Sequence, residues 1–217
     1  MAIAFDSTTD WWIWNPVTSL TFSHTCSWTN RILFVDFFGA VLADNITGVT
    51  YWWVSMTRAS ATVNGAAWTR YIYTYYLINP STGTNNVVIS ASASIAISGS
   101  ATSYNGVSQT WQPEVISSNN VNSTWITTTL TTLTSGAWTH WLFFCNAWWS
   151  TQNAWWWTTL RVNSINWHAS GDSNWSVTIW SNTLASSQAG TTNWSGIMVS
   201  FAPSVLANNS WFFQFFA

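Results

Sequence analysis

Ser19-Leu20-Thr21-Phe22-Ser23-His24 alternates small polar side chains with larger ones at a period of two. Ser94-Ile95-Ala96-Ile97-Ser98 repeats this pattern. Such alternation is typical of a β-strand that has one face buried and the other in water. The segments 31–38, 70–77 and 138–145 are more continuously apolar, which predicts central strands covered on both faces.

Similar stretches of β-branched and aromatic residues recur along the chain, and Thr, Ser and Asn separate them. No helical stripe accompanies them, so we predict an all-β, two-sheet antiparallel β-sandwich, jelly-roll-like, over residues 1–203. Residues 204–217 form an aromatic C-terminal tail or a terminal strand. Further strands are expected at 2–5, 49–57 as a hairpin, 124–132, 158–162, 176–180 and 196–201, with a turn at 79–83 and a long loop at 146–157. The core between the sheets is expected around Phe34, Val35, Tyr73, Ile89 and Phe143.

Charge is scarce in this sequence of 217 residues. Only 5% of residues are charged, the net charge is -2, and the four basic residues are all Arg. No basic surface is available to neutralise phosphates, so we expect no nucleic-acid partner. No apolar run reaches the length of a membrane-spanning helix, and the N-terminus does not resemble a signal peptide. A surface destination therefore needs another export route.

Residues suited to catalysis or metal binding are few and widely spaced. No CxxC, HxH or HExxH occurs, so we predict no metal site. No GxGxxG or phosphate-binding loop occurs either, and we expect no cofactor. Cys26 and Cys145 are able to form one disulfide or to remain as separate thiols. We assign no catalytic residue.

Gly171-Asp172-Ser173-Asn174-Trp175 is the one segment that resembles a catalytic motif, since it begins like the GDS motif of an esterase family. His168 is close in sequence, and an esterase would need His168, Asp172 and Ser173 to converge. A nucleophile elbow requires a helix after the serine, whereas the following residues have strand character. The other interpretation is a surface turn in which Asp172 and Asn174 hydrogen-bond the local backbone.

Tryptophan is over-represented, with 21 residues against only 10 glycines. Trp52-Trp53 occupies the centre of a predicted hairpin, where Gly or Asn is normally needed to reach positive φ. Trp148 and Trp149 lie in loop-like surroundings that usually carry glycine. UGA codons specify glycine in some bacterial lineages and tryptophan in others, so many of these Trp are interpreted as mis-decoded Gly. The alternative is that they are genuine and form aromatic platforms or a zipper between subunits.

With several Trp read as Gly, six blocks of the sequence resemble a group of uncharacterised β-rich proteins of phage and metagenomic origin, from candidate bacterial phyla. The resemblance implies a virion or cell-surface accessory protein and brings no established active site. The blocks are spread over most of the chain: 19–27, 30–35, 48–51, 76–80, 86–89 and 198–203.

These observations favour a non-enzymatic structural protein of a virion or cell surface, such as a tail-fibre or appendage module, that acts by self-assembly and surface contact. One alternative is a carbohydrate-binding jelly-roll module, in which Trp138 or Trp141 stacks on a surface glycan. The other is the small serine esterase. A homo-oligomer is expected through the aromatic tail, or else the tail is the last strand of its own sandwich. The tail residues concerned are Trp211, Phe212, Phe213, Phe215 and Phe216.

Overall fold

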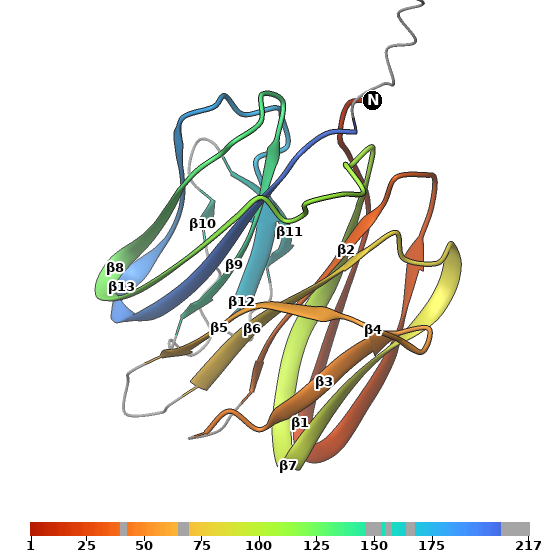
Figure 1. Ribbon diagram of the computed structural model, residues 1–217. Coiled ribbons are helices and arrows are strands. Elements are labelled where there is room, and N and C mark those ends of the chain that lie inside the picture. Colours follow the sequence, from red (N-terminus) through yellow and green to blue (C-terminus); the bar gives the residue numbers. More distant parts are fainter. Residues whose placement is uncertain (40–42, 65–69, 146–152, 155–157, 164–167, 205–217) are drawn as a thin grey trace, which may run out of the picture.

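A computed structural model describes residues 1–39, 43–64, 70–145, 153–154, 158–163 and 168–204 of the chain. All regular structure in these residues is β-strand, arranged as two curled antiparallel sheets that pack together (Figure 1). The predicted all-β sandwich is therefore confirmed. The two segments whose residues alternate in sequence, 19–24 and 94–98, both lie within strands.

The first sheet contains seven strands in the order β4-β3-β7-β2-β6-β5, with β1 paired to β7 outside this path. One edge of β7 pairs along almost its whole length with β1, while its other edge pairs first with β3 and then with β2. The strands are β1 (Ala4–Cys26), β2 (Ile32–Gly39), β3 (Ile46–Tyr51), β4 (Val54–Ser55), β5 (Thr57–Asn64), β6 (Arg70–Ile78) and β7 (Gly83–Asn105).

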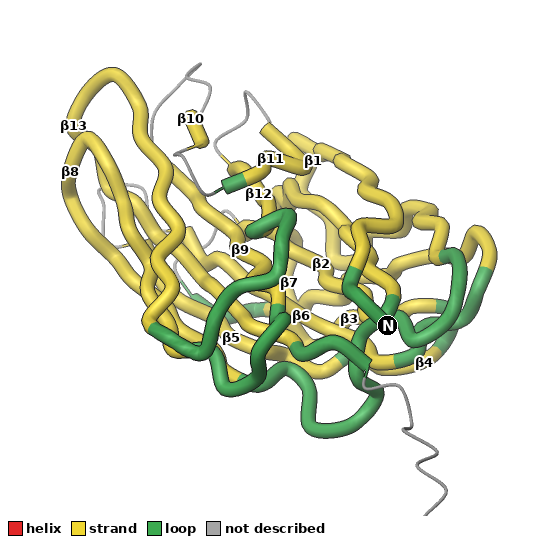
Figure 2. Tube along the Cα trace, turned by 90° about the horizontal axis from the view of Figure 1, so that it is seen from above, coloured by secondary structure: helices red, strands yellow, loops and turns green. Residues whose placement is uncertain are grey.

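The second sheet contains six strands in the order β10-β13-β9-β12-β11, with β8 paired to β13 outside this path. The strands are β8 (Val115–Thr131), β9 (Trp138–Cys145), β10 (Asn153–Ala154), β11 (Thr159–Asn163), β12 (His168–Asp172) and β13 (Ser181–Phe201). The first sheet is thus built from β1 to β7 and the second from β8 to β13. Figure 2 shows β8 and β13 on one side of the molecule and β3 and β4 on the other.

Strands β2 and β9 are buried on both faces, as their continuous apolar sequences predict. Leu33, Val35 and Phe37 of β2 face a core enclosed by the first sheet alone. Trp141 and Phe143 of β9 face a separate core enclosed by the second sheet. The alternate residues of both strands meet between the sheets in two further clusters. The period-two alternation therefore divides each central strand between two different cores.

The predicted core residues Phe34, Val35, Tyr73, Ile89 and Phe143 are all fully buried. They do not, however, form one neighbourhood. Only Phe34 lies in a cluster shared by both sheets; Val35, Tyr73 and Ile89 lie inside the first sheet and Phe143 inside the second. The prediction of a single core between the sheets is wrong because each sheet curls enough to enclose a core of its own.

The predicted hairpin at 49–57 is present as β3 and β4, and the turn at 79–83 separates β6 from β7. The strand expected at 176–180 is absent: there Val177 makes only an isolated bridge to Ala137. Cys26 and Cys145 are buried in separate cores, and no disulfide joins them. The predicted loop at 146–157 lies largely outside the described residues, and the predicted tail at 204–217 lies outside them except for Ser204.

Candidate functional site

A chain of buried polar side chains crosses the interface between the two sheets. Asp36 of β2 lies 2.5 Å from Nε2 of His140 of β9, and Nδ1 of His140 lies 2.9 Å from the Tyr104 hydroxyl of β7. Tyr104 donates a hydrogen bond of 2.9 Å to Asp172 of β12, which also binds Arg161 of β11 at 2.7 and 3.1 Å. We call these five residues the inter-sheet network. It ties β2 and β7 of one sheet to β9, β11 and β12 of the other.

The hydrogen-bond directions in the inter-sheet network follow from its donors and acceptors. The Tyr104 proton goes to the Asp172 carboxylate, so the Tyr104 oxygen accepts a hydrogen bond from Nδ1 of His140. Burial and the negative charge of Asp172 raise the pKa of Tyr104 well above its ordinary value, which keeps this phenol protonated. A hydrogen bond joins Nε2 of His140 to one carboxylate oxygen of Asp36, and the other oxygen accepts from Thr74 at 2.7 Å.

The inter-sheet network has the character of a structural clamp. The side chains of Asp36, His140 and Asp172 are completely buried, and the His140 ring stacks on Phe34 with the ring centroids 4.4 Å apart. None of the five residues lines any of the three surface pockets described for this chain. The network therefore connects the sheets and lies apart from these three pockets.

The residues of the predicted esterase motif do not converge. His168 and Ser173 lie five positions apart along and just beyond β12, which corresponds to about 16 Å in a strand. Nε2 of His168 faces Asp10 at 3.4 Å, whereas the Ser173 hydroxyl donates to the Trp175 carbonyl at 2.9 Å. Asp172 is engaged by Tyr104 and Arg161. The described geometry therefore does not form the nucleophile, base and acid arrangement that the motif would need.

The alternative interpretation is a surface turn in which Asp172 and Asn174 hydrogen-bond the local backbone. This interpretation is also wrong, because both side chains have other partners. Asp172 is completely buried, and Asn174 accepts a hydrogen bond of 2.6 Å from Arg161. Both side chains thus serve to hold one guanidinium, which also lies over the Phe5 ring at 4.0 Å. No signal in the linear sequence connects Arg161 with these residues, because the pairing of β11 with β12 creates the contact.

Trp138 and Trp141, the candidates for stacking on a glycan, are both buried in β9. Trp138 packs between the sheets beside Tyr104, and Trp141 stacks on Phe143 inside the second sheet. A buried indole presents no face to a sugar ring, so this placement removes both residues as a surface platform.

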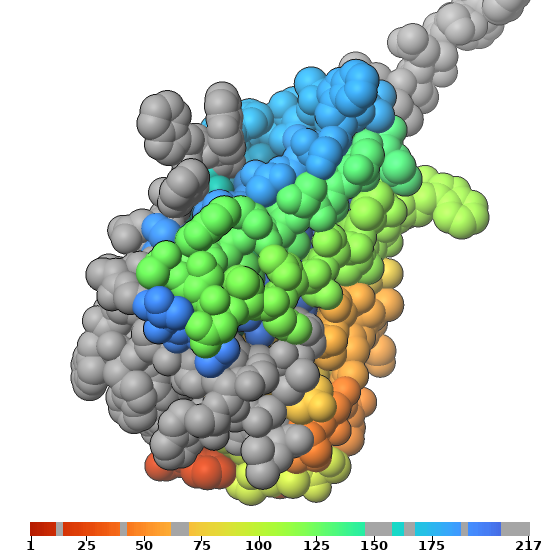
Figure 3. Space-filling view, turned by 90° about the vertical axis from the view of Figure 1, so that its left-hand side faces the viewer, coloured from red at the N-terminus to blue at the C-terminus, as the bar shows by residue number. Residues whose placement is uncertain are grey.

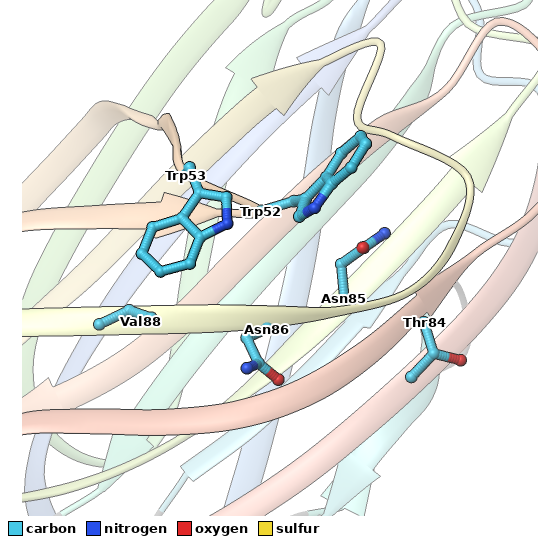
Figure 4. Close-up of a pocket in the computed structure, with 6 residues that line it drawn as sticks. All are labelled: Trp52, Trp53, Thr84, Asn85, Asn86 and Val88. Carbon is cyan, nitrogen blue, oxygen red and sulfur yellow. The ribbon is translucent and has the colours of Figure 1, made fainter.

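One pocket, lined by two exposed tryptophans, lies beside the β3–β4 hairpin. Figure 4 shows the indoles of Trp52 and Trp53 facing Asn85, Asn86 and Val88 of β7. Its volume is about 200 Å³, below the usual range of small-molecule sites. Aromatic faces beside amide groups are the chemistry that a carbohydrate site uses.

The free edges of the sheets differ in how well they are protected against pairing with another chain. β1 pairs only with β7, but Pro16 and three register shifts interrupt it. β5 and β11 are also edges, and each carries an Arg and a register shift. β4 and β10 are only two residues long. Proline, bulges, charges and short length are the features that natural sheets use to prevent edge pairing.

β8 lacks the charge, proline and short length that protect the other edges. It is 17 residues long and contains no charged residue and no proline. It bends where its ladder with β13 shifts register, so that the Asn119 side chain donates a hydrogen bond of 2.6 Å to the Thr127 carbonyl of the same strand. Among the described residues β13 is its only ladder partner; β5 approaches β8 without pairing. Exposed and partly exposed residues alternate over its first half, and Figure 3 shows this green segment across the face of the molecule. We call the side of β8 that faces away from β13 the β8 edge.

His24 of β1 is another buried histidine, and its side chain contacts residues of β1 and β7. Its Nδ1 lies 3.0 Å from the Thr9 hydroxyl, and its Nε2 lies 3.1 Å from the Ser103 hydroxyl. Burial lowers the pKa of His24 to about 4, although the nearby Asp6 carboxylate opposes the shift. The ring is therefore neutral at pH 7 and serves as a hydrogen-bonded part of the core.

This lowered pKa predicts a loss of stability in acid. An unfolded histidine titrates near 6.5, so the unfolded chain binds more protons than the folded chain between pH 6.5 and 4. The contribution of neutral His24 to the free energy of unfolding is fully present above pH 6.5. About 2–3 kcal/mol of this free energy is lost by pH 4.5. Urea unfolding at pH 7 and 4.5 should show a smaller acid loss for His24→Gln than for the wild type. Equal losses in the two proteins would contradict the assignment.

Among the described residues no cluster of three or more His, Cys, Asp or Glu is arranged to hold a metal ion. The same part of the chain contains no helix long and apolar enough to cross a membrane.

The fold and its free edges thus define the class of this protein: an all-β sandwich of two curled antiparallel sheets, with one long unprotected edge. No known protein family matches the chain, and no match was found among curated proteins or solved structures.

Proposed function

We propose that this chain is a non-enzymatic structural protein of a virion or cell surface, and that it acts by self-assembly and surface contact. The observation that carries the proposal is the β8 edge. An uncharged edge strand offers backbone donors and acceptors to an incoming strand. The Thr127 carbonyl already accepts a hydrogen bond from Asn119, so the first half of β8, residues 115–122, is the part that carries the proposal. The location on a virion or cell surface rests on the resemblance of six sequence blocks to β-rich proteins of phage and metagenomic origin.

The partner that fits the β8 edge best is β8 of a second copy. Two identical strands pair antiparallel about a two-fold axis, which gives a closed, self-complementary contact. Like charges on opposed strands normally prevent such pairing, and β8 has no charge to oppose it. Its Ser, Thr and Asn side chains are able to hydrogen-bond across the new ladder. Ile116, which is 41% exposed, adds apolar contact.

Placing lysines on β8 tests this assembly. Ile116→Lys with Ser118→Lys changes two exposed positions of the strand, and lysine is a natural blocker of edge pairing. We expect the wild type to form dimers or larger multimers by light scattering, and the double variant to become monomeric with an unchanged circular dichroism spectrum.

The matched control is Ser19→Lys with Thr21→Lys, which adds the same charge at exposed positions of the other long edge strand, β1. This control should remain multimeric. A monomeric wild type, or a β8 variant that keeps the multimers, would contradict the proposal. If only the β1 variant lost its multimers, assembly would occur through β1 and the proposal would be wrong.

A carbohydrate-binding module is the second candidate, and the pocket of Trp52 and Trp53 is the observation that favours it. Exposed indoles beside the Asn85 and Asn86 amides have the chemistry to stack on a sugar and hydrogen-bond its hydroxyls. Calorimetric titration with soluble oligosaccharides would test it, and Trp53→Ala should abolish any binding. This function requires that residues 52 and 53 are indeed tryptophan.

A further inference from the structure

Four tryptophans adopt a backbone conformation that this residue rarely takes. Trp28, Trp52, Trp53 and Trp111 have φ values of 63°, 44°, 69° and 56°. This left-handed region brings Cβ close to the backbone and is a genuine outlier for bulky side chains. Among the described residues, the other positions with positive φ are three asparagines and three glycines. Those six are the residue types that tolerate it.

Phenylalanine and tyrosine provide an internal comparison for these tryptophans. Their side chains are similarly bulky and together nearly as numerous as tryptophan, yet none of those described has a positive φ. Bulk or aromatic character therefore does not explain the conformation. Among the described residues, tryptophan is the one aromatic residue type found at positive φ.

Packing does not compensate for the strain at these positions. Trp28, Trp52, Trp53 and Trp111 are 73%, 53%, 88% and 94% exposed. A strained residue normally persists because its surroundings fix it in place. By contrast, the buried residues Trp138, Trp141 and Trp194 lie in strands and have no positive φ.

The β3–β4 hairpin makes the argument most directly. Trp52 and Trp53 are the two central residues between Tyr51 and Val54, which pair with each other. Both have positive φ, as in a type I′ turn, for which Asn-Gly and Gly-Gly are the preferred sequences. Two adjacent tryptophans are among the poorest choices for this turn.

We infer that positions 28, 52, 53 and 111 are glycine in the protein that its source organism makes, encoded by UGA codons that this organism reads as glycine. The inference is independent of the β8 edge. Its functional consequence concerns the pocket beside the hairpin, because glycine at 52 and 53 removes both indoles that line it. The native surface there would then be a tight, flat turn without a platform for a sugar ring.

The gene and the native protein provide the decisive test. We expect UGA at these four codons, and UGG at two or more of them would overturn the inference, because UGG is not read as glycine. Where UGA is found, tandem mass spectrometry of the protein from its source reads the residue directly. Glycine at three or four of the positions supports the inference, and tryptophan at two or more overturns it.

Recombinant variants of the tryptophan-containing chain supply a second test. Trp53→Gly relieves a left-handed residue, so its melting temperature should rise by about 2–4 °C. The matched control is Trp180→Gly, because Trp180 is 74% exposed and has no positive φ. Glycine at this position only raises the conformational entropy of the unfolded chain, which lowers stability. The control should melt at the same temperature as the parent or lower. An equal rise in both variants, or no rise for Trp53→Gly, would contradict the conformational argument.

Discussion

Asp36→Ala is expected to lower the free energy of unfolding by about 3–5 kcal/mol, because it removes the shared acceptor of two buried hydrogen bonds. Asp36 and His140 are both fully buried and lie 2.5 Å apart. Without the carboxylate, Nε2 of His140 and the Thr74 hydroxyl lose their acceptor in a place that water does not reach. Asp36→Asn retains an acceptor oxygen, so its loss should be smaller. Urea unfolding followed by circular dichroism measures both.

The matched control for this prediction is Asp44→Ala. Asp44 binds Arg58, and the two side chains are 35% and 33% exposed. Asp44 also accepts hydrogen bonds from the Tyr73 hydroxyl at 3.1 Å and the Ile46 amide at 3.3 Å, in a site that water reaches. Exposed ion pairs contribute about 0–1 kcal/mol, since water and salt screen them. If Asp36→Ala and Asp44→Ala destabilised the protein equally, the inter-sheet network would not be the clamp described above.

Phe143→Ala should destabilise the protein by about 3–5 kcal/mol, the usual cost of removing a buried phenylalanine ring. Phe143 is fully buried inside the second sheet, where it stacks on Trp141 with the ring centroids 4.4 Å apart. A Cβ atom on Gly196 would lie 2.7 Å from the Phe143 ring, so the ring fills the space that this glycine leaves. The remaining residues are held in strands and cannot collapse fully into the cavity.

Leu133→Ala is the control for Phe143→Ala, because Leu133 is 62% exposed and its truncation should change stability by no more than about 0.5 kcal/mol. Guanidinium unfolding at pH 7 compares the two variants. A small loss for Phe143→Ala would mean that the second sheet does not enclose a packed core of its own.

The candidate site was only partly predictable from the sequence. The scarcity of charge was evident, but nothing in Val115–Thr131 marks β8 as an unprotected edge until its pairing with β13 alone is known. Likewise, the GDS-like segment offered a serine, a histidine and an aspartate, and the extended strand then separated His168 from Ser173. Spacing along a chain does not determine which side chains meet when the partners lie on different strands.

The sequence by itself determined the class of the fold and the central strands. Period-two alternation sends neighbouring side chains to opposite faces, and this local rule holds whatever the strand pairs with. It also indicated that Trp52-Trp53 occupies a turn that favours glycine, because turn conformation is a local property of the backbone. Only the tertiary structure decided that each sheet encloses its own core, and that Asp36 meets His140 across the interface. These contacts depend on sheet curvature and on pairing between distant segments, which arise from the summed packing of the whole chain.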